Sequence, residues 1–351
     1  MKKQILIFLI NFSFLNQLIA QIPHKVVICG VCRDVAERVP YSMRIMENIG
    51  HLFQDYRIIV YENNSTDATP QLLREWQERN PKVFALTEHI DKDTLEKIMI
   101  NRLDDGNYYR PELIARARNI VLKNALSDTY KDFAYIIWMD MDFKLEPNYA
   151  GIQEVFETNR EWDAVFAYGT DPHHIYWDWY AFRDYRCPIG SELLGNYWWH
   201  LPKQLVLNTN SDWYPVYSAF GGCGIYKKDS IRDCQYSALA NDDLAAFSRE
   251  IIEKYKHTNS VVQKYLEDVK NMKDCIFIPI PSPTQPNITN PQVGVRVSHN
   301  NQDIVWKMSS FVYKYPSVCE HVPFHASMIV RGHDKLFINP RLIFHYGDFI
   351  A

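Results

Sequence analysis

The chain has 351 residues, of which 47% are hydrophobic and 23% are charged. This balance is typical of a globular protein and excludes an intrinsically disordered chain. The formal net charge is -4, and Lys and Arg are interspersed with Asp and Glu, so no basic block could follow a phosphate backbone. The composition therefore excludes nucleic acid as the expected partner and favours a small polar substrate.

The first twenty residues differ from the rest of the chain. Lys2 and Lys3 precede an apolar run from Ile5 to Ala20, which is short for a membrane span. This order predicts a signal peptide or, if it stays uncleaved, an N-terminal anchor that is the only contact with a membrane. We expect residues 21–351 to work in a secretory pathway, in the Golgi or endoplasmic reticulum lumen of a eukaryote, or secreted or membrane-tethered in a bacterium.

The cysteines do not form a recognisable framework. Seven of them are scattered along the chain, which is an odd number and not the spacing of a compact disulfide scaffold. Cys29 and Cys32 have the spacing of half a zinc site, but no second pair accompanies them and they lie in an expected buried strand. We interpret them as packed or bridged cysteines.

From Lys25 onward, short apolar runs alternate with helical patterns, which predicts an α/β fold with a mostly parallel central sheet flanked by helices. We expect a single domain. The predicted strands are 25–32, 57–61, 83–87, 133–139 and 163–168. The predicted helices between them are about 41–53, 70–79 and 112–126. A Trp- and Tyr-rich stretch at 175–200, a helical stretch at 242–270 and a Pro-rich loop at 279–291 follow.

Polar residues follow several of the predicted strands. Arg33 and Asp34 follow the first strand, residues 62–64 follow the second, and residues 140–142 follow the fourth. Because parallel strands joined by right-handed crossovers end at one edge of the sheet, these side chains should collect where ligands bind in such folds.

Asp140 and Asp142 come directly after the near-continuous apolar strand Phe133–Met139. Side chains alternate across a strand, so the two carboxylates should project to the same side. Two adjacent carboxylates repel each other unless a cation or a shared proton lies between them. Oxygen ligands of this kind favour Mg²⁺ or Mn²⁺, which can also bind the phosphates of a nucleotide-sugar.

Two further segments suit a nucleotide ligand. The turn at 61–67 can hydrogen-bond a ribose or base edge, although Ser65 or Thr66 could instead cap the next helix with Asp67 in its first turn. Arg116 and Arg118 suit a diphosphate, although helical arginines are more often solvated or paired with acids. The stretch 175–200 holds four Trp that could form a wall or lid around a ligand, or simply a core.

Seven short motifs occur in a specific order. They are ENNSTDAT at 62–69, RARN at 116–119, WMDMD at 138–142, YWDWYAFRD at 176–184, FGGCGIY at 220–226, CEHVPF at 319–324 and INP at 338–340. Together they resemble a GT-A (Rossmann-like) glycosyltransferase, most similar to the fungal capsule-associated α-1,3-mannosyltransferase family, from about Val26 to Tyr346.

The resemblance implies a metal-dependent enzyme that moves a hexose, with mannose as the candidate, from a nucleotide-diphospho-sugar to a glycan or other hydroxyl acceptor. Residues 21–146 would bind the donor and residues 147–351 the acceptor. The implied site residues are Arg33, Glu62, Asn63, Asn64, Asp67, Arg116, Arg118 and Asp140 for the donor; Trp177, Asp178, Arg183, Asp184, Gly221 and Gly222 for the acceptor; Asp140, Asp142 and His345 for Mn²⁺ or Mg²⁺; and Glu320 for catalysis.

The resemblance gives some of these residues specific roles. Gly221 and Gly222 would form a tight turn whose backbone approaches the donor or acceptor. Glu320 would be the general base of an inverting enzyme, or would orient the acceptor or stabilise charge on the sugar in a retaining one. His321, His325 and His333 are interpreted as neutral imidazoles in hydrogen-bonded loops.

Other classes remain open at this point. A sugar nucleotidyltransferase would need a Gly-rich basic loop after the first strand, where residues 29–34 carry one Gly. A glycoside hydrolase would need its two carboxylates about 5 to 9 Å apart across a bond. A non-catalytic carbohydrate-binding protein with a degenerate transferase fold is the third alternative. The tripeptide 287–289 (Asn-Ile-Thr) is a candidate N-glycosylation acceptor.

Overall fold

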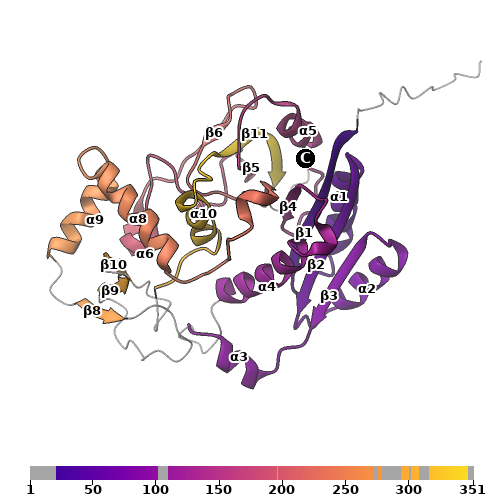
Figure 1. Cartoon of the computed structure of the whole chain (residues 1–351), viewed down its shortest axis with the longest axis horizontal. Coiled ribbons are helices and arrows are strands. Elements are labelled where there is room, and N and C mark those ends of the chain that lie inside the picture. The colour runs from indigo at the N-terminus through magenta and orange to yellow at the C-terminus, as the bar shows by residue number, and fades with distance from the viewer. Residues whose placement is uncertain are drawn as a thin grey trace, which may run out of the picture.

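The computed structural model describes residues 21–101, 110–195, 197–271, 275–278, 294–299, 302–307 and 316–346. Its centre is an eight-stranded sheet flanked by helices (Figure 1). The N-terminal segment 1–20 and the Pro-rich loop at 279–291, with its glycosylation tripeptide, lie outside the described residues. Within the described part, no helix combines the length and apolar character that crossing a bilayer requires.

The central sheet is mostly parallel, as predicted. Its order is β3-β2-β1-β4-β7-β5-β11-β6, in which β6 and β7 run against the other six strands. The strands are β1 (Ile22–Cys32), β2 (Phe53–Asn63), β3 (Val83–Glu88), β4 (Tyr135–Met139), β5 (Ala164–Thr170), β6 (Tyr214–Pro215), β7 (Cys223–Lys227) and β11 (Leu336–His345).

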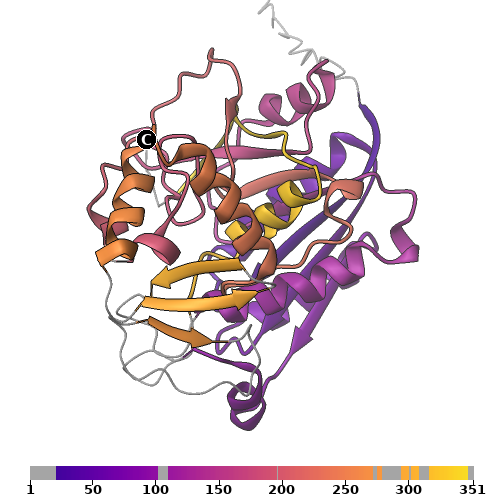
Figure 2. The ribbon, with the colours of Figure 1, turned by 60° about the vertical axis from the view of Figure 1, so that its left-hand side comes forward.

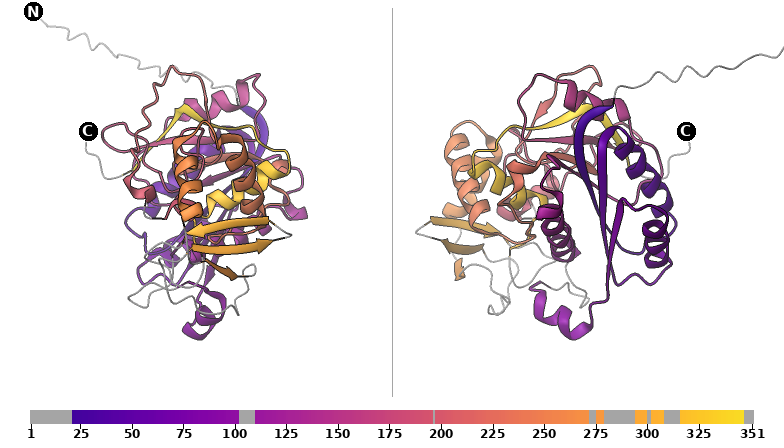
Figure 3. Two further views of the ribbon diagram at one scale, coloured as in Figure 1. Left: turned by 90° about the vertical axis from the view of Figure 1, so that its left-hand side faces the viewer. Right: turned by 45° about the vertical axis from the view of Figure 1, so that its right-hand side comes forward.

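Helices cover both faces of this sheet (Figure 3). The helices are α1 (Val39–His51), α2 (Thr69–Arg79), α3 (Lys92–Ile98), α4 (Arg110–Ala125), α5 (Tyr149–Glu157), α6 (Ser191–Leu194), α7 (Tyr197–His200), α8 (Asp242–Tyr255), α9 (Ser260–Asn271) and α10 (His321–Val330), with short 3-10 turns at Asp128–Tyr130 and Lys228–Ile231. A separate three-stranded sheet, of order β10-β9-β8, consists of β8 (Cys275–Ile278), β9 (Gly294–His299) and β10 (Gln302–Lys307) (Figure 2).

Alternation along β1 explains the two-sided core. Val27 and Cys29 belong to the apolar cluster that α4 and α10 cover, whereas Val26 and Ile28 belong to the cluster that α1 and α2 cover. Successive side chains of a strand point to opposite faces, so a strand covered on both sides must be apolar at every position. This is why the apolar runs of the sequence identify these strands.

Two predicted elements differ from the structure. The helical stretch expected at 242–270 is two helices, because Asn259 ends the first pattern and caps α9, its side chain accepting from Val261 N and Val262 N at 2.9 and 3.1 Å. The helix expected at 41–53 is α1, which starts two residues earlier because Pro40 suits a first helical turn. Phe53 instead begins β2.

The cysteines in the described residues are packed rather than bridged. None of the six whose side chains are described forms a disulfide, and Cys29 is completely buried in β1. Burial raises the pKa of the Cys29 and Cys32 thiols well above the usual range, so neither is a ready thiolate ligand.

The strand order also locates the ligand-binding edge. β1 pairs with β2 on one side and with β4 on the other. The strand order therefore reverses between β1 and β4: β2 and β3 extend the sheet on the β1 side, and the later strands extend it on the β4 side. In open α/β sheets, such a switch point leaves a crevice beyond the carboxyl ends of the two strands. A large cavity lies there, lined by residues 31–35 at the end of β1 and 140–142 after β4.

Candidate active site

The cavity has a volume of about 940 Å³, within the range of small-molecule sites. Segments far apart in the sequence line it: the ends of β1, β2 and β4, helix α4, the loop after β5, and the start of α10. Among the predicted site residues, it is lined by Arg33, Asn63, Asn64, Arg118, Asp140, Asp142, Trp177, Asp178 and Glu320.

Asp140 and Asp142 line the cavity, while Met139 and Phe143 are buried in the core and Met141 is buried where the core meets the cavity. Burial raises the pKa of Asp140; the neighbouring Arg118 opposes the shift, and Asp142, Asp178 and Glu320 add to it. Asp142 Oδ1 is buried and accepts no hydrogen bond within the described part of the chain. A carboxylate oxygen left in this way at an acidic site is suited to a cation.

The oxygens of these two aspartates fit Mg²⁺ or Mn²⁺. The described residues contain no group of three His, Cys, Asp or Glu side chains that could hold a metal by themselves. Mg²⁺ is usually held by one or two carboxylates together with substrate phosphates, so a pair of aspartates is a sufficient protein contribution.

His345, the expected third ligand, does not line the cavity. Its ring lies beside β5, with Nδ1 3.3 Å from Thr170 Oγ1. Alternation along β11 explains this placement, since the next residue, Tyr346, points the other way and lines the cavity. Tyr346 donates from its hydroxyl to Asp140 Oδ2 at 3.3 Å, a contact that sequence reasoning missed and strand periodicity could have indicated.

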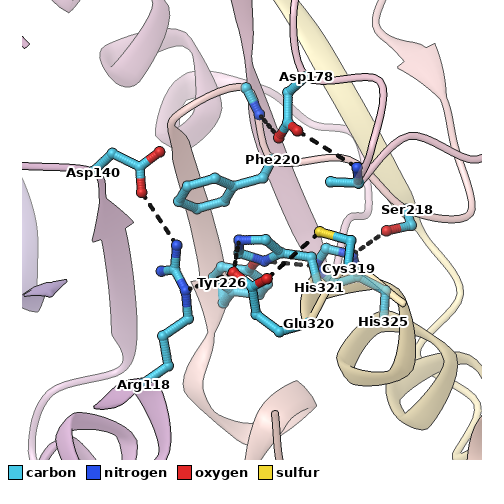
Figure 4. A network of polar contacts seen from close by, with 12 residues as sticks. Arg118, Asp140, Asp178, Ser218, Phe220, Tyr226, Cys319, Glu320, His321 and His325 are labelled. Carbon is cyan, nitrogen blue, oxygen red and sulfur yellow. Dashed lines mark hydrogen bonds and ion pairs between the residues drawn. The ribbon is translucent and has the colours of Figure 1, made fainter. Parts of the chain in front are cut away.

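Arg118 is a buried cation beneath the cavity (Figure 4). Its Nη2 donates to Asp140 Oδ1 and its Nε to Glu320 Oε1, each at 3.2 Å. Its guanidinium also lies over the rings of Trp138, Phe220 and Tyr236, at 5.2, 4.8 and 5.7 Å from their centroids. The remaining nitrogen, Nη1, is buried without a hydrogen-bond partner in the described chain.

Arg116 lies elsewhere, although it is only two positions away. Its Nη1 and Nη2 bind the Glu88 carboxylate at 2.9 Å each, and Nη1 also donates to Tyr61 Oη at 2.8 Å. Residues two apart on a helix do not share a face. The structure therefore gives Arg116 the ion-pair role and brings Arg118 alone to the cavity.

The polar residues of the turn after β2 also have two different roles, since some line the cavity and others hold the turn together. Asn63 and Asn64 line the cavity, whereas Asp67 accepts from Ala36 N and Thr69 N at 2.9 Å each. Glu62 is buried, with Oε1 accepting from Ser65 N at 2.7 Å. Glu62 and Asp67 therefore shape the turn instead of facing a ligand.

Ser65 and Thr66 do not cap α2, whose N-cap position is Ala68. Ser65 Oγ accepts from Asp34 N at 3.0 Å, and Asp34 Oδ1 accepts from Thr66 N at 2.6 Å. Side-chain oxygens of short polar residues often bind backbone N–H groups in this manner. These bonds tie the loop after β1 to the loop after β2, so that Arg33 and Asp34 stand beside Asn63 and Asn64 at one end of the cavity.

On the other side, Asp178 lines the cavity and Trp177 stands at its edge with 57% of its surface exposed. Asp178 Oδ2 accepts from Gly221 N at 3.2 Å, and burial raises the pKa of Asp178 to about 6. Of the four Trp in this stretch, Trp198 is buried in the core and Trp199 is half exposed. The stretch is thus partly core and partly cavity rim.

Gly221 and Gly222 lie just outside the cavity lining. Both have positive φ, +62° and +86°, and a Cβ at Gly222 would collide with the Phe143 ring. Gly221 N binds Asp178, and Gly222 O accepts from Asp140 N at 2.9 Å. The turn therefore positions two cavity carboxylates through its backbone.

Arg183 and Asp184 are both completely buried away from the cavity. Arg183 Nη2 binds Glu192 Oε2 at 2.6 Å, and its guanidinium lies 4.8 Å from the Trp198 ring centroid. Asp184 accepts from Tyr214 Oη at 2.6 Å and pairs with Arg186 at 2.7 Å. These charges are internally compensated, so they hold the loop after β5 together.

Glu320 immediately precedes α10 and lines the cavity, with His321 beside it (Figure 4). The imidazoles at 321 and 325 lie in this helix, not in a loop, and only His325 is hydrogen-bonded within the described chain. His333 lies with Nδ1 3.4 Å from Asp163 Oδ1. His321, like Tyr346, lines the cavity although the sequence did not assign it to the site.

No family model matches the sequence, and no curated protein matches it. Similar solved structures include residues 1–349 of S. aureus TarS, with 11% identity and a TM-score of 0.37, covering 66% of this chain and 55% of that chain. The mannosyltransferase PcManGT from Pyrobaculum calidifontis, in complex with GDP-Man and Mn²⁺, has 13% identity and a TM-score of 0.35, covering 67% and 53%. Glucosyl-3-phosphoglycerate synthase from Mycobacterium tuberculosis, in complex with UDP, has 11% identity and a TM-score of 0.33, covering 84% and 90%. The chain spans about half the length of the first two TarS structures it matches, 55% and 43%. These distant similarities do not assign an activity.

Proposed function

We propose that this chain is a divalent-cation-dependent glycosyltransferase of the GT-A type, which moves a hexose from a nucleotide-diphospho-sugar to a hydroxyl acceptor. The observation that carries the proposal is a set of buried polar atoms around one cavity that have no hydrogen-bond partner in the described chain: Asp142 Oδ1, Arg118 Nη1 and both ring nitrogens of His321. Buried polar groups are almost always hydrogen-bonded, because each unmade bond costs about 1–3 kcal/mol. A divalent cation at Asp142, with a ligand that presents anionic and hydroxyl groups to Arg118 and His321, would satisfy all of them.

The donor half of the proposal rests on the edge formed by β1, β2 and β4. Asp140 and Asp142 would hold Mn²⁺ or Mg²⁺, which when bound neutralises charge on the departing diphosphate. Arg118 Nη1 would donate to an anionic oxygen of the same ligand. Arg33 and Asn63 would bind the nucleoside at the end of the cavity where the loops after β1 and β2 are tied together. Asn64 would hold the loop there, because its amide donates to Ile90 O at 2.8 Å and accepts from Ile90 N at 3.0 Å.

The acceptor half rests on Asp178, Glu320 and Trp177. The two carboxylates face the cavity and can accept a hydrogen bond from an acceptor hydroxyl. The exposed indole of Trp177 offers a flat apolar face at the cavity edge, a surface suited to the C–H face of a sugar ring. The sequence resemblance favours mannose as the transferred sugar, and the N-terminal order of two lysines and an apolar run favours a secretory compartment as the location. Both are part of this proposal.

The test is transfer by the Asp142→Asn variant. Because Asp142 Oδ1 has no partner to lose, the variant should melt at or above the wild-type temperature. Its Mn²⁺-dependent transfer should fall by at least about a hundredfold, equivalent to about 2.7 kcal/mol of lost stabilisation. Transfer is measured by mass shift of methyl glycosides with UDP-glucose, UDP-N-acetylglucosamine and GDP-mannose as donors.

The matched control is Asp132→Asn, which changes an exposed acid just before β4 and should leave both melting temperature and transfer unchanged. Glu320→Gln, assayed in parallel, should lower turnover more than donor affinity. Wild-type transfer rates in Asp142→Asn would falsify the assignment of the cation site. A soluble wild-type protein whose melting temperature responds to neither Mn²⁺ nor any donor would favour a non-catalytic role.

A further inference from the structure

His321 is held rigidly in the cavity wall. It is the first residue of α10, and 2% of its surface is exposed. Its ring stacks on Phe220, with 4.0 Å between centroids and 20° between planes, and meets the edge of Tyr236 at 5.7 Å. The orientation of the imidazole is therefore fixed by packing against aromatic rings on two sides.

Neither ring nitrogen of His321 has a hydrogen-bond partner in the described chain. The nearest acidic oxygen, Glu320 Oε1, lies 3.6 Å from Nε2, which is too long for a hydrogen bond, and it already accepts from Arg118 Nε. A buried imidazole in this state costs free energy unless something else satisfies it. Since His321 lines the cavity, a bound molecule is the available partner.

One turn later on the same helix, His325 shows the contrasting arrangement. It is fully buried, and the two ring centroids are 5.7 Å apart. Its Nδ1 lies 2.8 Å from Ser218 Oγ and its Nε2 3.0 Å from Tyr226 Oη. The chain thus hydrogen-bonds both nitrogens of the imidazole that faces the core and neither nitrogen of the one that lines the cavity, whose approach to Glu320 in Figure 4 is the 3.6 Å contact.

The charge state of His321 narrows the kind of ligand. Burial lowers the pKa of His321 well below its usual range, and the nearby Arg118 and His325 lower it further. The ring is therefore neutral, with one donor and one acceptor, and does not act as a cation for a phosphate. A hydroxyl group also has one donor and acceptor lone pairs, so it complements the neutral ring.

We propose that His321 and Glu320 together bind one hydroxyl group of a pyranose sugar, with the hydroxyl accepting from the imidazole N–H and donating to the Glu320 carboxylate. This inference rests on the proposed function and adds a specificity-determining residue to it. The hydroxyl can belong to the donor sugar or to the acceptor sugar, which present the same chemistry. The site would select sugars that carry a hydroxyl at the corresponding ring position.

The test variant is His321→Phe, which keeps an aromatic ring against Phe220 and removes both nitrogens. The free protein should melt at or above the wild-type temperature, because no internal hydrogen bond is lost. Transfer should fall about tenfold or more, which corresponds to one lost hydrogen bond to a ligand hydroxyl. His325→Phe is the matched control, and it should instead lower the melting temperature by several degrees, since Ser218 and Tyr226 each lose a partner.

Deoxy sugars identify the hydroxyl. Each hydroxyl of the active donor, and then of the methyl glycoside acceptor, is removed in turn, and kcat and KM are measured for wild type and His321→Phe. When the recognised hydroxyl is removed, kcat/KM of the wild type should fall by about the same factor as the His321→Phe substitution lowers it. The kcat/KM of the variant should change little, because its contact with that hydroxyl is already lost. A donor position points to the donor sugar, and an acceptor position with a raised acceptor KM points to the acceptor.

Failure of this inference is distinct from failure of the proposed function. Equal transfer rates in an active wild type and His321→Phe overturn the hydroxyl site while leaving the transferase intact. If the wild type transfers no sugar, the hydroxyl site is judged by thermal shift with methyl α-mannopyranoside and methyl β-glucopyranoside. A larger shift in the wild type than in His321→Phe supports the site, and equal or absent shifts overturn it.

Discussion

Arg118 and Glu320 are 202 positions apart in the sequence, and Arg118 Nε donates to Glu320 Oε1 across 3.2 Å inside the fold. The same guanidinium donates to Asp140, so one buried cation joins α4, the end of β4 and the start of α10. Three aromatic rings enclose it. The carboxylates of the cavity are thus arranged around a fixed positive charge.

Replacing this cation should therefore destabilise the fold. In Arg118→Met, two carboxylates near the cavity lose their buried partner, and the free energy of unfolding should fall by about 3–5 kcal/mol. The matched control is Arg116→Met on the same helix, where the lost ion pair with Glu88 is partly exposed and should cost at most about 1 kcal/mol. Urea unfolding of both variants measures the difference. Equal losses would contradict the central role of Arg118.

The glycine turn before β7 offers a second test. Gly222 and Gly332 have nearly the same φ, +86° and +88°, so alanine at either position should cost about 1–3 kcal/mol of backbone strain. At Gly222 the new Cβ would also collide with the Phe143 ring. At Gly332 nothing lies within 4 Å of the position of the new Cβ. Since Gly222 O accepts from Asp140 N, Gly222→Ala should also weaken Mn²⁺ binding.

Mn²⁺ affinity is the readout that separates these two variants, measured by calorimetry on folded protein. Gly332→Ala should bind Mn²⁺ as the wild type does, because residue 332 follows α10 and lies outside the cavity lining. Unchanged Mn²⁺ affinity in both variants would show that the turn does not position Asp140.

The sequence was sufficient to predict five of the eight strands of the central sheet and the placement of the acidic pair. Strands β1 and β4 are covered on both faces, so their apolar runs stand out against the helical patterns around them. Asp140 and Asp142 follow directly from period-two alternation at a strand end. These features depend on neighbours in the sequence, which local patterns report.

The remaining site residues depend on partners that are distant in the sequence. Arg118 faces Glu320 while Arg116 faces Glu88, and no local signal says which acid each helical arginine will meet. Arg183 can be fully buried only because Glu192 compensates its charge there. Such compensation is a property of the packed chain, so motif reasoning placed Arg183 at a ligand site when it supports a loop.

The pH dependence of stability should report the buried imidazole at position 325. Burial lowers the pKa of His325 to about 3, and Arg118 adds to the shift. Below the unfolded pKa of about 6.5, His325 binds a proton in the unfolded chain but stays neutral in the folded chain. The free energy of unfolding therefore falls as the pH falls. One such group contributes a slope of up to about 1.4 kcal/mol per pH unit between about pH 6 and pH 4.

The His325→Phe variant lacks this group, so its free energy of unfolding should fall less steeply with acid than that of the wild type. Denaturant unfolding at a series of pH values measures both slopes. The difference at pH 8, where neither state holds the proton, gives the loss of the Ser218 and Tyr226 hydrogen bonds together with the change in packing. Because other titrating groups, including His321, are common to both proteins, parallel curves from pH 8 to pH 4 would mean that His325 is protonated equally in the folded and unfolded states.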